Sequence, residues 1–270
     1  MLKQRLLTAI ILIPLFVALI LKLSPFYFGV LTFFIVMGCG WEWTSLIGLH
    51  KVSSRLTYLL ILCVFLICSC FLNIKTALIF ALFWWIYASF LVLIYPKLSQ
   101  AWSNGIAVRS IMGLFTLGLC WLSLLFLRSS GNGQYLVLFL FVLIWGADSG
   151  AYFAGKKWGK TPLLPNVSPG KTREGLLGAL LTTLIITIVC LLLSKDKTVS
   201  WAYIILLAEV TVLFSIMGDL FESMLKRKMN LKDSGKLLPG HGGLLDRIDS
   251  LTAAAPIFAL GLLLLEKNIY

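Results

Sequence analysis

Long apolar stretches separated by short polar breaks run along the whole chain. One apolar run of about 20 residues crosses the hydrocarbon core of a bilayer as an α-helix. The pattern predicts nine such helices, with bounds placed to within a few residues: 6–21, 26–48, 57–73, 76–95, 110–127, 134–154, 175–193, 201–221 and 251–266. We therefore expect an all-α, polytopic transmembrane helical bundle.

The first of these stretches follows a short charged leader, as a signal peptide would. Its apolar run, 6–21, is longer than the hydrophobic region of a signal peptide, and residues 22–26 contain no small-residue cleavage site. We interpret it as a retained first helix.

Basic residues are divided unequally between alternate connections. If the N-terminus lies in the cytoplasm, only six of the 23 Lys and Arg residues fall outside and the others fall inside. Short loops rich in Lys and Arg remain on the cytoplasmic side. Nine spans with a cytoplasmic N-terminus agree with this bias, and we expect a multi-pass protein of a bacterial inner (cytoplasmic) membrane.

The composition agrees with a membrane protein. Hydrophobic residues make up 60% of the chain and charged residues 13%, whereas an ordinary soluble domain has about 25% charged residues. The net charge of +12 would suit nucleic acid, but the basic residues border membrane spans and form no separate basic domain. We therefore expect membrane lipid and nucleotide phosphates as partners, and no nucleic acid.

Polar sequence is concentrated in the second half of the chain. We divide the chain into a generic membrane region, 1–130, and a C-terminal catalytic region, 131–270. The catalytic region contains two long connections, 155–174 and 222–250, which the charge bias assigns to the cytoplasm. Both are basic and rich in Gly, and the second contains four of the eleven acidic residues.

Carboxylates alternate with cations in the second loop and the helix ends beside it. On a helix, Asp219, either Glu222 or Ser223, and Lys226 share one face, as do Asp246 and Asp249 at the start of the last span. A carboxylate at a membrane interface is unfavourable without a partner, and hard oxygen ligands beside phosphate suggest Mg²⁺. A structural network of aspartates and arginines is the alternative.

Glycines surround His241 in the same loop. Gly242 and Gly243 permit a tight turn whose amides could face an anion, while Lys232 and Arg247 supply positive charge. The side chain of His241, with an ordinary pKa of about 6.5, could carry a proton, bind a ligand or have a structural role. Without the flanking charges, a plain interhelical turn would explain the glycines.

Asp148 is a candidate in the first loop, because it lies near the end of an apolar span. The segment Gly170-Lys171-Thr172 resembles the end of a P-loop. However, position 165 is Pro where that motif has its leading Gly, and an apolar helix precedes it in place of a strand. We therefore exclude a P-loop.

Two glutamates, Glu42 and Glu209, lie within apolar runs. They could serve a proton path, although a neutral or paired role in helix packing is the favoured interpretation. A secondary transporter would use these residues with Asp148 and Asp219 as an ion relay, but it would also show broken helices in repeated halves. The sequence contains no such repeat.

One pattern of charged, Gly and Pro residues extends across the second loop. It reads Ser223-x-Leu225-Lys226-Arg227, four further residues, Lys232-Asp233-x-Gly235, and then Leu238-Pro239-x-His241-Gly242-Gly243-Leu244-x-Asp246-Arg247-Ile248-Asp249. Over its whole length this pattern resembles the signature of the phosphatidate cytidylyltransferases. Two further stretches, Asp148-Ser-Gly-Ala-Tyr-Phe and Ser168-Pro-x-Lys171-Thr-x-Glu174-Gly, are also similar to segments of that family.

The resemblance implies that phosphatidate attacks the α-phosphorus of CTP and that pyrophosphate leaves. We expect Mg²⁺ at Asp219, Asp246 and Asp148, and we expect Lys226, Arg227 and Asp249 to join Asp219 and Asp246 as catalytic residues. The substrate-binding set comprises Lys171, Arg173, Ser223, Lys232, Asp233, His241, Gly242, Gly243 and Arg247. The family also suggests a homodimer. A CTP-dependent kinase of a membrane polyisoprenoid alcohol would use similar groups but transfer the γ-phosphoryl group.

Overall fold

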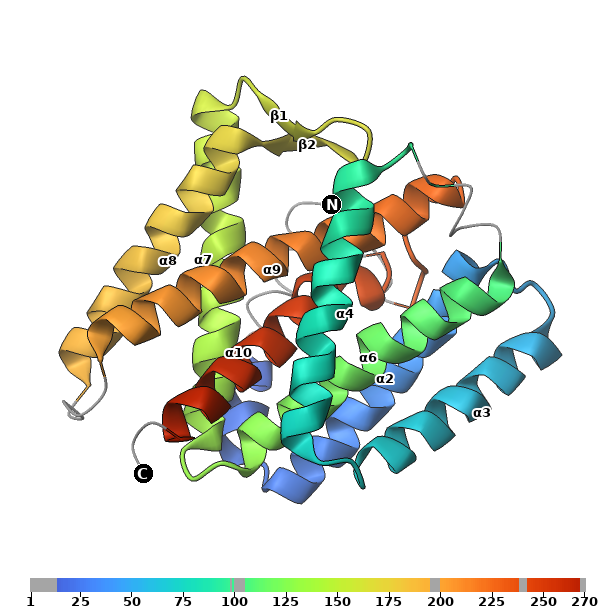
Figure 1. Cartoon of the computed structure of the whole chain (residues 1–270), viewed down its shortest axis with the longest axis horizontal. Coiled ribbons are helices and arrows are strands. Elements are labelled where there is room, and N and C mark those ends of the chain that lie inside the picture. The colour runs from blue at the N-terminus through green and yellow to red at the C-terminus, as the bar shows by residue number, and fades with distance from the viewer. Residues whose placement is uncertain (1–13, 98, 100–104, 195–199, 238–241, 268–270) are drawn as a thin grey trace.

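The computed structural model describes residues 14–97, 99, 105–194, 200–237 and 242–267 (Figure 1). Residues 14–22 are helical. The other elements in chain order are α2 (Pro25–Ile47), α3 (Val52–Ser69), α4 (Ile74–Ile94), α6 (Ile106–Ser129), α7 (Gly133–Trp158), β1 (Pro162–Leu164), β2 (Ser168–Thr172), α8 (Arg173–Leu193), α9 (Trp201–Lys228), the 3₁₀ turn η1 (Leu245–Arg247) and α10 (Asp249–Lys267). The chain is therefore a helical bundle with one small hairpin.

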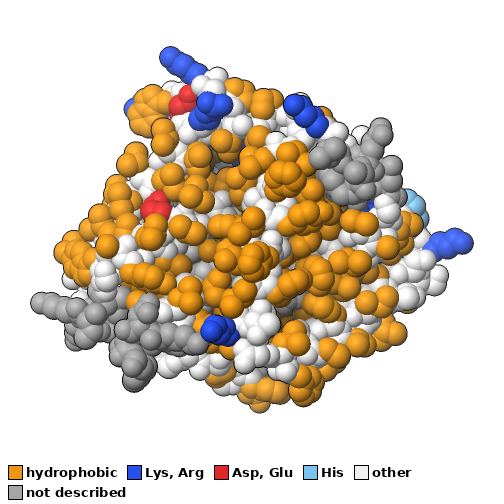
Figure 2. Space-filling model, viewed as in Figure 1, with side chains coloured by type: hydrophobic (Ala, Val, Ile, Leu, Met, Phe, Trp, Pro, Cys, Tyr) orange, Lys and Arg blue, Asp and Glu red, His pale blue; other side chains and the backbone are white. Residues whose placement is uncertain are grey.

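Seven of the described helices, α2, α3, α4, α6, α7, α8 and α9, are long and apolar enough to cross a membrane, and 249–265 is a shorter apolar helix. Hydrophobic side chains cover most of the face in Figure 2, while Lys and Arg side chains gather mainly along its upper and right edges. These features make the chain an all-α, multi-pass membrane protein. Eight of the nine predicted apolar segments correspond to α2–α10. Half of the first, 6–21, lies outside the described residues, and the other half, 14–21, is helical.

Two helices extend beyond their predicted ends. α7 continues to Trp158 and α9 to Lys228, into the segments predicted to be loops. The apolar pattern ends near the membrane boundary, but basic residues favour helix and interact well with the negative C-terminal end of the helix dipole. The last turns of α7 and α9 are indeed basic. The second loop is therefore shorter than expected.

The first loop forms an antiparallel hairpin that connects α7 and α8 (Figure 1). Pro162 pairs with Thr172 and Leu164 with Ser168, with an irregular register between them. The Thr172 side chain caps α8 by accepting a hydrogen bond from the Gly175 amide. The hairpin was not predicted, and it places Lys171 at a fixed distance from the start of α8.

Small residues allow α7 and α8 to approach each other closely. A Cβ atom added to Gly150 would lie 2.5 Å from the carbonyl oxygen of Gly178, and one added to Gly178 would lie 2.6 Å from that of Gly150. Such helix contacts in membranes depend on small side chains, because lipid gives little hydrophobic drive for helix association. The helix pair that carries the hairpin is thus tightly packed.

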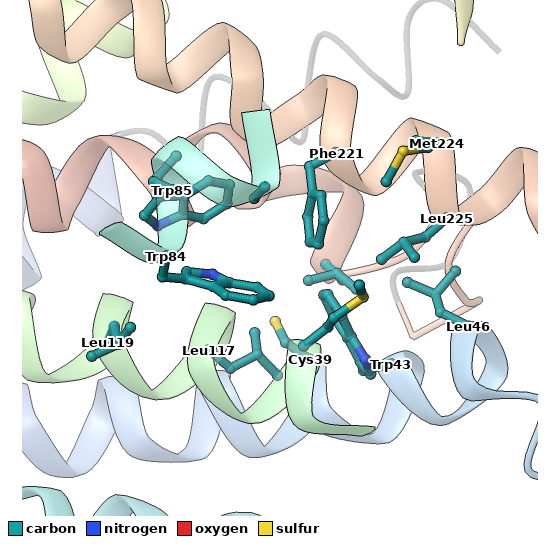
Figure 3. Close-up of a cluster of buried hydrophobic side chains, with 14 of the residues drawn as sticks. Cys39, Trp43, Leu46, Trp84, Trp85, Leu117, Leu119, Phe221, Met224 and Leu225 are labelled. Atoms are coloured by element: carbon teal, nitrogen blue, oxygen red, sulfur yellow. The ribbon is translucent and has the colours of Figure 1, made fainter. Parts of the chain in front are cut away.

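An aromatic cluster holds α9 against the first half of the bundle (Figure 3). The ring centroid of Phe221 lies 6.5 Å from that of Trp43, 6.0 Å from that of Trp84 and 5.8 Å from that of Trp85. Each aromatic pair of this kind contributes about 1 kcal/mol beyond the burial of its surface. Phe221 therefore fixes the turn of α9 between Asp219 and Ser223.

Candidate active site

The C-terminal half of α9 carries a row of polar side chains. The Ser223 hydroxyl donates a hydrogen bond to Asp219 over 3.2 Å, one helical turn apart. The Lys226 ammonium lies 3.1 Å from the Glu222 carboxylate, also one turn apart. The predicted shared face of Asp219 and Ser223 is confirmed, and the row continues to the end of the helix.

The hairpin brings Lys171 to Asp219. The Nζ atom of Lys171 lies 2.6 Å from Oδ2 of Asp219, and both side chains are about one quarter exposed. Asp148 of α7 lies within electrostatic range of both residues. Charged residues from α7, the hairpin and α9 thus meet at one place, which we call the Lys171 group: Asp148, Lys171 and Asp219.

A cavity of about 380 Å³ opens beside the Lys171 group, between α7, α8 and the hairpin. Asp148 and Lys171 supply charged groups to its wall, whereas Tyr152, Leu176 and Ile216 supply apolar surface. Tyr152 and Leu177 on the two helices are about 60% exposed. The cavity can therefore hold an anionic group beside a surface suited to lipid.

Lys226 is shared by two carboxylates near the end of α9. Its Nζ atom lies 2.6 Å from Oδ1 of Asp246 in addition to its contact with Glu222. The side chains of Lys226, Glu222 and Asp246 are 12%, 3% and 14% exposed. We call these three residues the Lys226 group. It is a largely buried cluster whose cation is enclosed by carboxylates.

Backbone amides of the second loop surround Asp246. The amides of Ser234 and Gly243 each donate to Oδ2 over 3.0 Å. Gly242 has a φ of +83°, a conformation that glycine adopts without steric strain. The loop thus folds back on its own carboxylate, and η1 presents Asp246 to Lys226.

These contacts determine the pKa of Asp246. Burial tends to raise it, but the neighbouring Glu222 side chain, the hydrogen bond and charge of Lys226 and the hydrogen bond from the Ser234 amide together lower it from 3.8 to about 2. The Asp246 side chain is therefore a carboxylate at neutral pH.

Because the pKa of Asp246 is lower in the folded than in the unfolded protein, the stability of the fold depends on pH in the acidic range. The unfolded chain binds this proton first, so the stabilisation by Asp246 is complete above about pH 4 and disappears as the pH falls towards 2. At neutral pH it amounts to the order of 2 kcal/mol. We expect the thermal midpoints of wild-type protein and Asp246→Asn in detergent to converge as the pH falls from about 4 to about 2. A constant difference across this range would contradict the assignment.

Asp249 begins α10 between the two groups. It lies within electrostatic range of Asp219, Lys171 and Lys226. A Cβ atom on Gly218 would lie only 2.6 Å from the Asp249 carbonyl oxygen. The backbones of α9 and α10 therefore touch next to Asp219, which brings Asp249 close to it.

Carboxylate oxygens at this place suit Mg²⁺ in their chemistry. Among the described residues, three or more His, Cys, Asp or Glu side chains nowhere converge in a way that could hold a metal ion. Mg²⁺ is commonly bound by one or two carboxylates, with substrate phosphates and water completing its octahedron. Asp219 and Asp249 fit such a partial donor set, and the assignment of Asp219, Asp246 and Asp148 as ligands stays a prediction.

Three of the other predicted residues, Arg173, Arg227 and Arg247, have exposed side chains. The Nε atom of Arg227 donates to the Val167 carbonyl oxygen over 3.3 Å, which ties α9 to the hairpin. His241 lies outside the described residues. The substrate-binding roles of these residues remain predictions.

A second cavity, of about 590 Å³, lies between the end of α2, the start of α3 and the first limb of the second loop. Lys232 and Asp233 line it together with Arg55, whose guanidinium lies 5.3 Å from the ring centroid of Trp41. Of the predicted substrate-binding residues, Lys171 lines the first cavity, and Lys232 and Asp233 line the second.

The two glutamates of the apolar runs have different surroundings. The Glu209 carboxylate accepts a hydrogen bond from the Thr183 hydroxyl over 3.1 Å, which confirms the paired role in helix packing. Glu42 instead contacts the second loop through Ser234, Leu237 and Leu245. Sequence reasoning missed this role, although an acidic residue near the end of an apolar run was a signal.

Comparison with known proteins finds similarity along almost the whole chain. The cytidylyltransferase family model matches residues 3–265. A phosphatidate cytidylyltransferase of Haemophilus influenzae is 38% identical over 281 residues, which cover 96% of this chain and 98% of that protein. The enzyme of that name from Pseudomonas aeruginosa is 41% identical over 261 residues, which cover 96% of each chain. One from Staphylococcus saprophyticus is 37% identical over 66% of this chain and 67% of its own.

Proposed function

The chain belongs to the cytidylyltransferase family, and on this premise we propose that it transfers the cytidylyl group of CTP to phosphatidate, forming CDP-diacylglycerol and pyrophosphate. The observation that carries this proposal is the meeting of Lys171 with Asp219 of α9, the helix that also carries Lys226 and Glu222. Two substrate phosphates require such paired cations. The relatives that share the name cover nearly the whole chain.

The reaction needs positioning more than it needs a base. An oxygen of the phosphatidate phosphate bonds to the α-phosphorus of CTP, and the bond to the oxygen bridging to the β-phosphorus breaks, with its electron pair leaving on pyrophosphate. A phosphate monoester has a second pKa of about 6, so the nucleophile is already ionised. The protein must bring two polyanions together and offset the charge on the leaving group.

Lys171 is suited to the phosphate of phosphatidate. It lines the cavity whose apolar wall continues onto the exposed faces of α7 and α8. The acyl chains would remain in the bilayer while the headgroup enters the cavity from the side. In the absence of substrate, Asp219 neutralises Lys171, and an incoming phosphate would take its place as the partner of the ammonium.

We assign the Lys226 group to the CTP side of the reaction. Lys226 is held by Glu222 and Asp246, so it presents its charge in one orientation with little loss of side-chain entropy on binding. The predicted ligands Asp219, Asp246 and Asp148, with Asp249 close to Asp219 as a further candidate, would hold Mg²⁺. When bound, the ion would neutralise charge developing on pyrophosphate.

The site is assigned to the cytoplasmic side of a bacterial inner membrane. CTP is a cytosolic nucleotide, and the last turns of α7 and α9, the helices that carry the site, contain basic residues. Short basic segments favour that side. We also propose that the protein is a homodimer, as the family suggests, and native mass spectrometry in detergent can measure this oligomeric state.

The test of the proposed reaction uses the purified full chain in detergent micelles with Mg²⁺ and CTP labelled on either the α- or the γ-phosphate. Pyrophosphate release that requires phosphatidate, with the α-label in a lipid product, supports the transferase. CDP together with a γ-labelled lipid alcohol would indicate the kinase. Absence of any turnover by folded protein would overturn the proposal.

Two lysines on α9 offer a matched comparison. Lys226 lies between Glu222 and Asp246, whereas Lys228 forms none of the ion pairs found among the described residues. We expect Lys226→Gln to raise the KM for CTP by about tenfold or more, because a charge-assisted phosphate contact is lost. Lys228→Gln should change it less than about twofold, as for a residue that only follows the positive-inside rule. Equal effects of the two replacements on this KM would refute the assignment.

A further inference from the structure

Glu42 is a buried carboxylate that accepts three hydrogen bonds from the second loop. It lies in α2 and is 2% exposed. Its Oε1 accepts from the Leu237 amide over 3.1 Å, and its Oε2 accepts from the Ser234 hydroxyl over 3.3 Å and from the Leu245 amide over 2.8 Å. All three partners are donors, so the side chain is used entirely as an acceptor.

These donors come from both limbs of the loop. Ser234 and Leu237 belong to the limb that follows α9, and Leu245 belongs to the limb that precedes α10. The same limbs supply the two amides, from Ser234 and Gly243, that bind Oδ2 of Asp246. Glu42 therefore holds together the chain segments that surround Asp246.

Two glycines make room for this arrangement. A Cβ atom on Gly243 would lie 2.8 Å from both the Glu42 and the Asp246 carboxylate oxygens. A Cβ atom on Gly235 would collide with the Glu42 carboxylate. The loop thus passes between two carboxylates at distances that only glycine permits, and its position depends on both.

We propose that Glu42 is a positioning residue for cytidylyl transfer: through the two limbs of the second loop it fixes Asp246 against Lys226. The proposal rests on the proposed function, and it assigns a role in the site to a helix of the first half of the chain. Glu42 has no contact with Lys226 among the described residues, so it acts on the site through the loop. A carboxylate is required because each of its oxygens accepts from a backbone amide, so the NH₂ group of a Gln side chain would face the N–H of either Leu237 or Leu245.

The test compares Glu42→Gln with Glu209→Gln, the same replacement of another glutamate in an apolar helix, which contacts Thr183 and not the loop. We expect Glu42→Gln to lower kcat roughly 100-fold, as for a misplacement of about 1 Å at a reacting centre. The amides of 234–237 and 243–245 should exchange hydrogen at least about tenfold faster. Glu209→Gln should leave kcat and the exchange of these amides close to wild type, even if it lowers the thermal midpoint as much.

Two further variants separate positioning from general stability. Ser234→Ala removes one of the three hydrogen bonds and should give a smaller loss of kcat, and its effect should vanish in a Glu42→Gln background because both act through the same loop. Glu42→Asp keeps the charge and should recover part of the lost kcat. Unchanged exchange in Glu42→Gln, or a kcat loss no larger than the loss of folded protein, would overturn the proposal. If wild-type protein releases no pyrophosphate, the proposed function fails, while the exchange data still decide whether Glu42 holds the loop.

Discussion

Replacing Asp246 by Asn is expected to reduce kcat by roughly 10³-fold while the protein remains folded. Asn has nearly the same shape, but it removes the charge that lies 2.6 Å from Lys226. One half of its amide is also a donor, which must face either the Lys226 ammonium or an amide of Ser234 or Gly243. The loop and Lys226 should both shift. Phosphatidate-dependent release of pyrophosphate measures the effect.

Asp233→Asn is the matched comparison for kcat, because it makes the same chemical change at an exposed carboxylate of the same loop, and as a predicted substrate-binding residue Asp233 should affect mainly KM. We expect its loss of kcat to be less than about tenfold, since an exposed charge contributes little. In a double-mutant cycle that combines Asp246→Asn with Lys226→Gln, the losses of kcat in the two single variants should be strongly non-additive, as for residues that act as a unit. An Asp246→Asn enzyme within tenfold of wild type would show that the Lys226 group is structural only.

Much of the fold could be predicted because each long apolar run in the sequence directly indicates one membrane helix. The cores of α2 to α10 follow directly from such runs. The ends of α7 and α9 could not be predicted in this way, since the polar last turns are held by helical hydrogen bonds and not by lipid. The hairpin was missed because β1 and β2 are three and five residues long. Strands this short carry no usable alternation.

The candidate site was predictable where its contacts are local. Asp219 and Ser223 are one turn apart on α9, so helical spacing predicted their contact. Lys171 and Asp219 are 48 residues apart, and Glu42 and Leu245 are 203 apart. No local spacing connects such pairs, because they meet only when the helices pack. The division at residue 130 also remains a prediction, but Glu42 connects the first part of the chain to the site in the second.

Asp219→Ala should abolish transfer and weaken the binding of a divalent cation. We expect kcat to fall by at least about 10³-fold, since a metal ligand and the partner of Lys171 are lost together. Binding of Mn²⁺, a paramagnetic substitute for Mg²⁺, can be followed by electron paramagnetic resonance without turnover. Its Kd should rise by at least about tenfold. Glu209→Ala on the same helix α9 is the control and should leave this Kd unchanged, because Glu209 bonds to Thr183.

The direction in which Lys171→Met changes the Kd for Mn²⁺ shows whether Asp219 is a metal ligand or only the partner of a structural ion pair. The Lys171 ammonium, 2.6 Å from Asp219, competes with a cation for the same carboxylate. Its removal should therefore lower the Kd for Mn²⁺ while kcat/KM for phosphatidate falls on the order of 100-fold, because the lipid phosphate loses its cation. Opposite changes in metal affinity for Asp219→Ala and Lys171→Met are what a shared carboxylate requires. If neither variant alters the Kd for Mn²⁺, Asp219 is the partner of Lys171 and not a ligand of the metal.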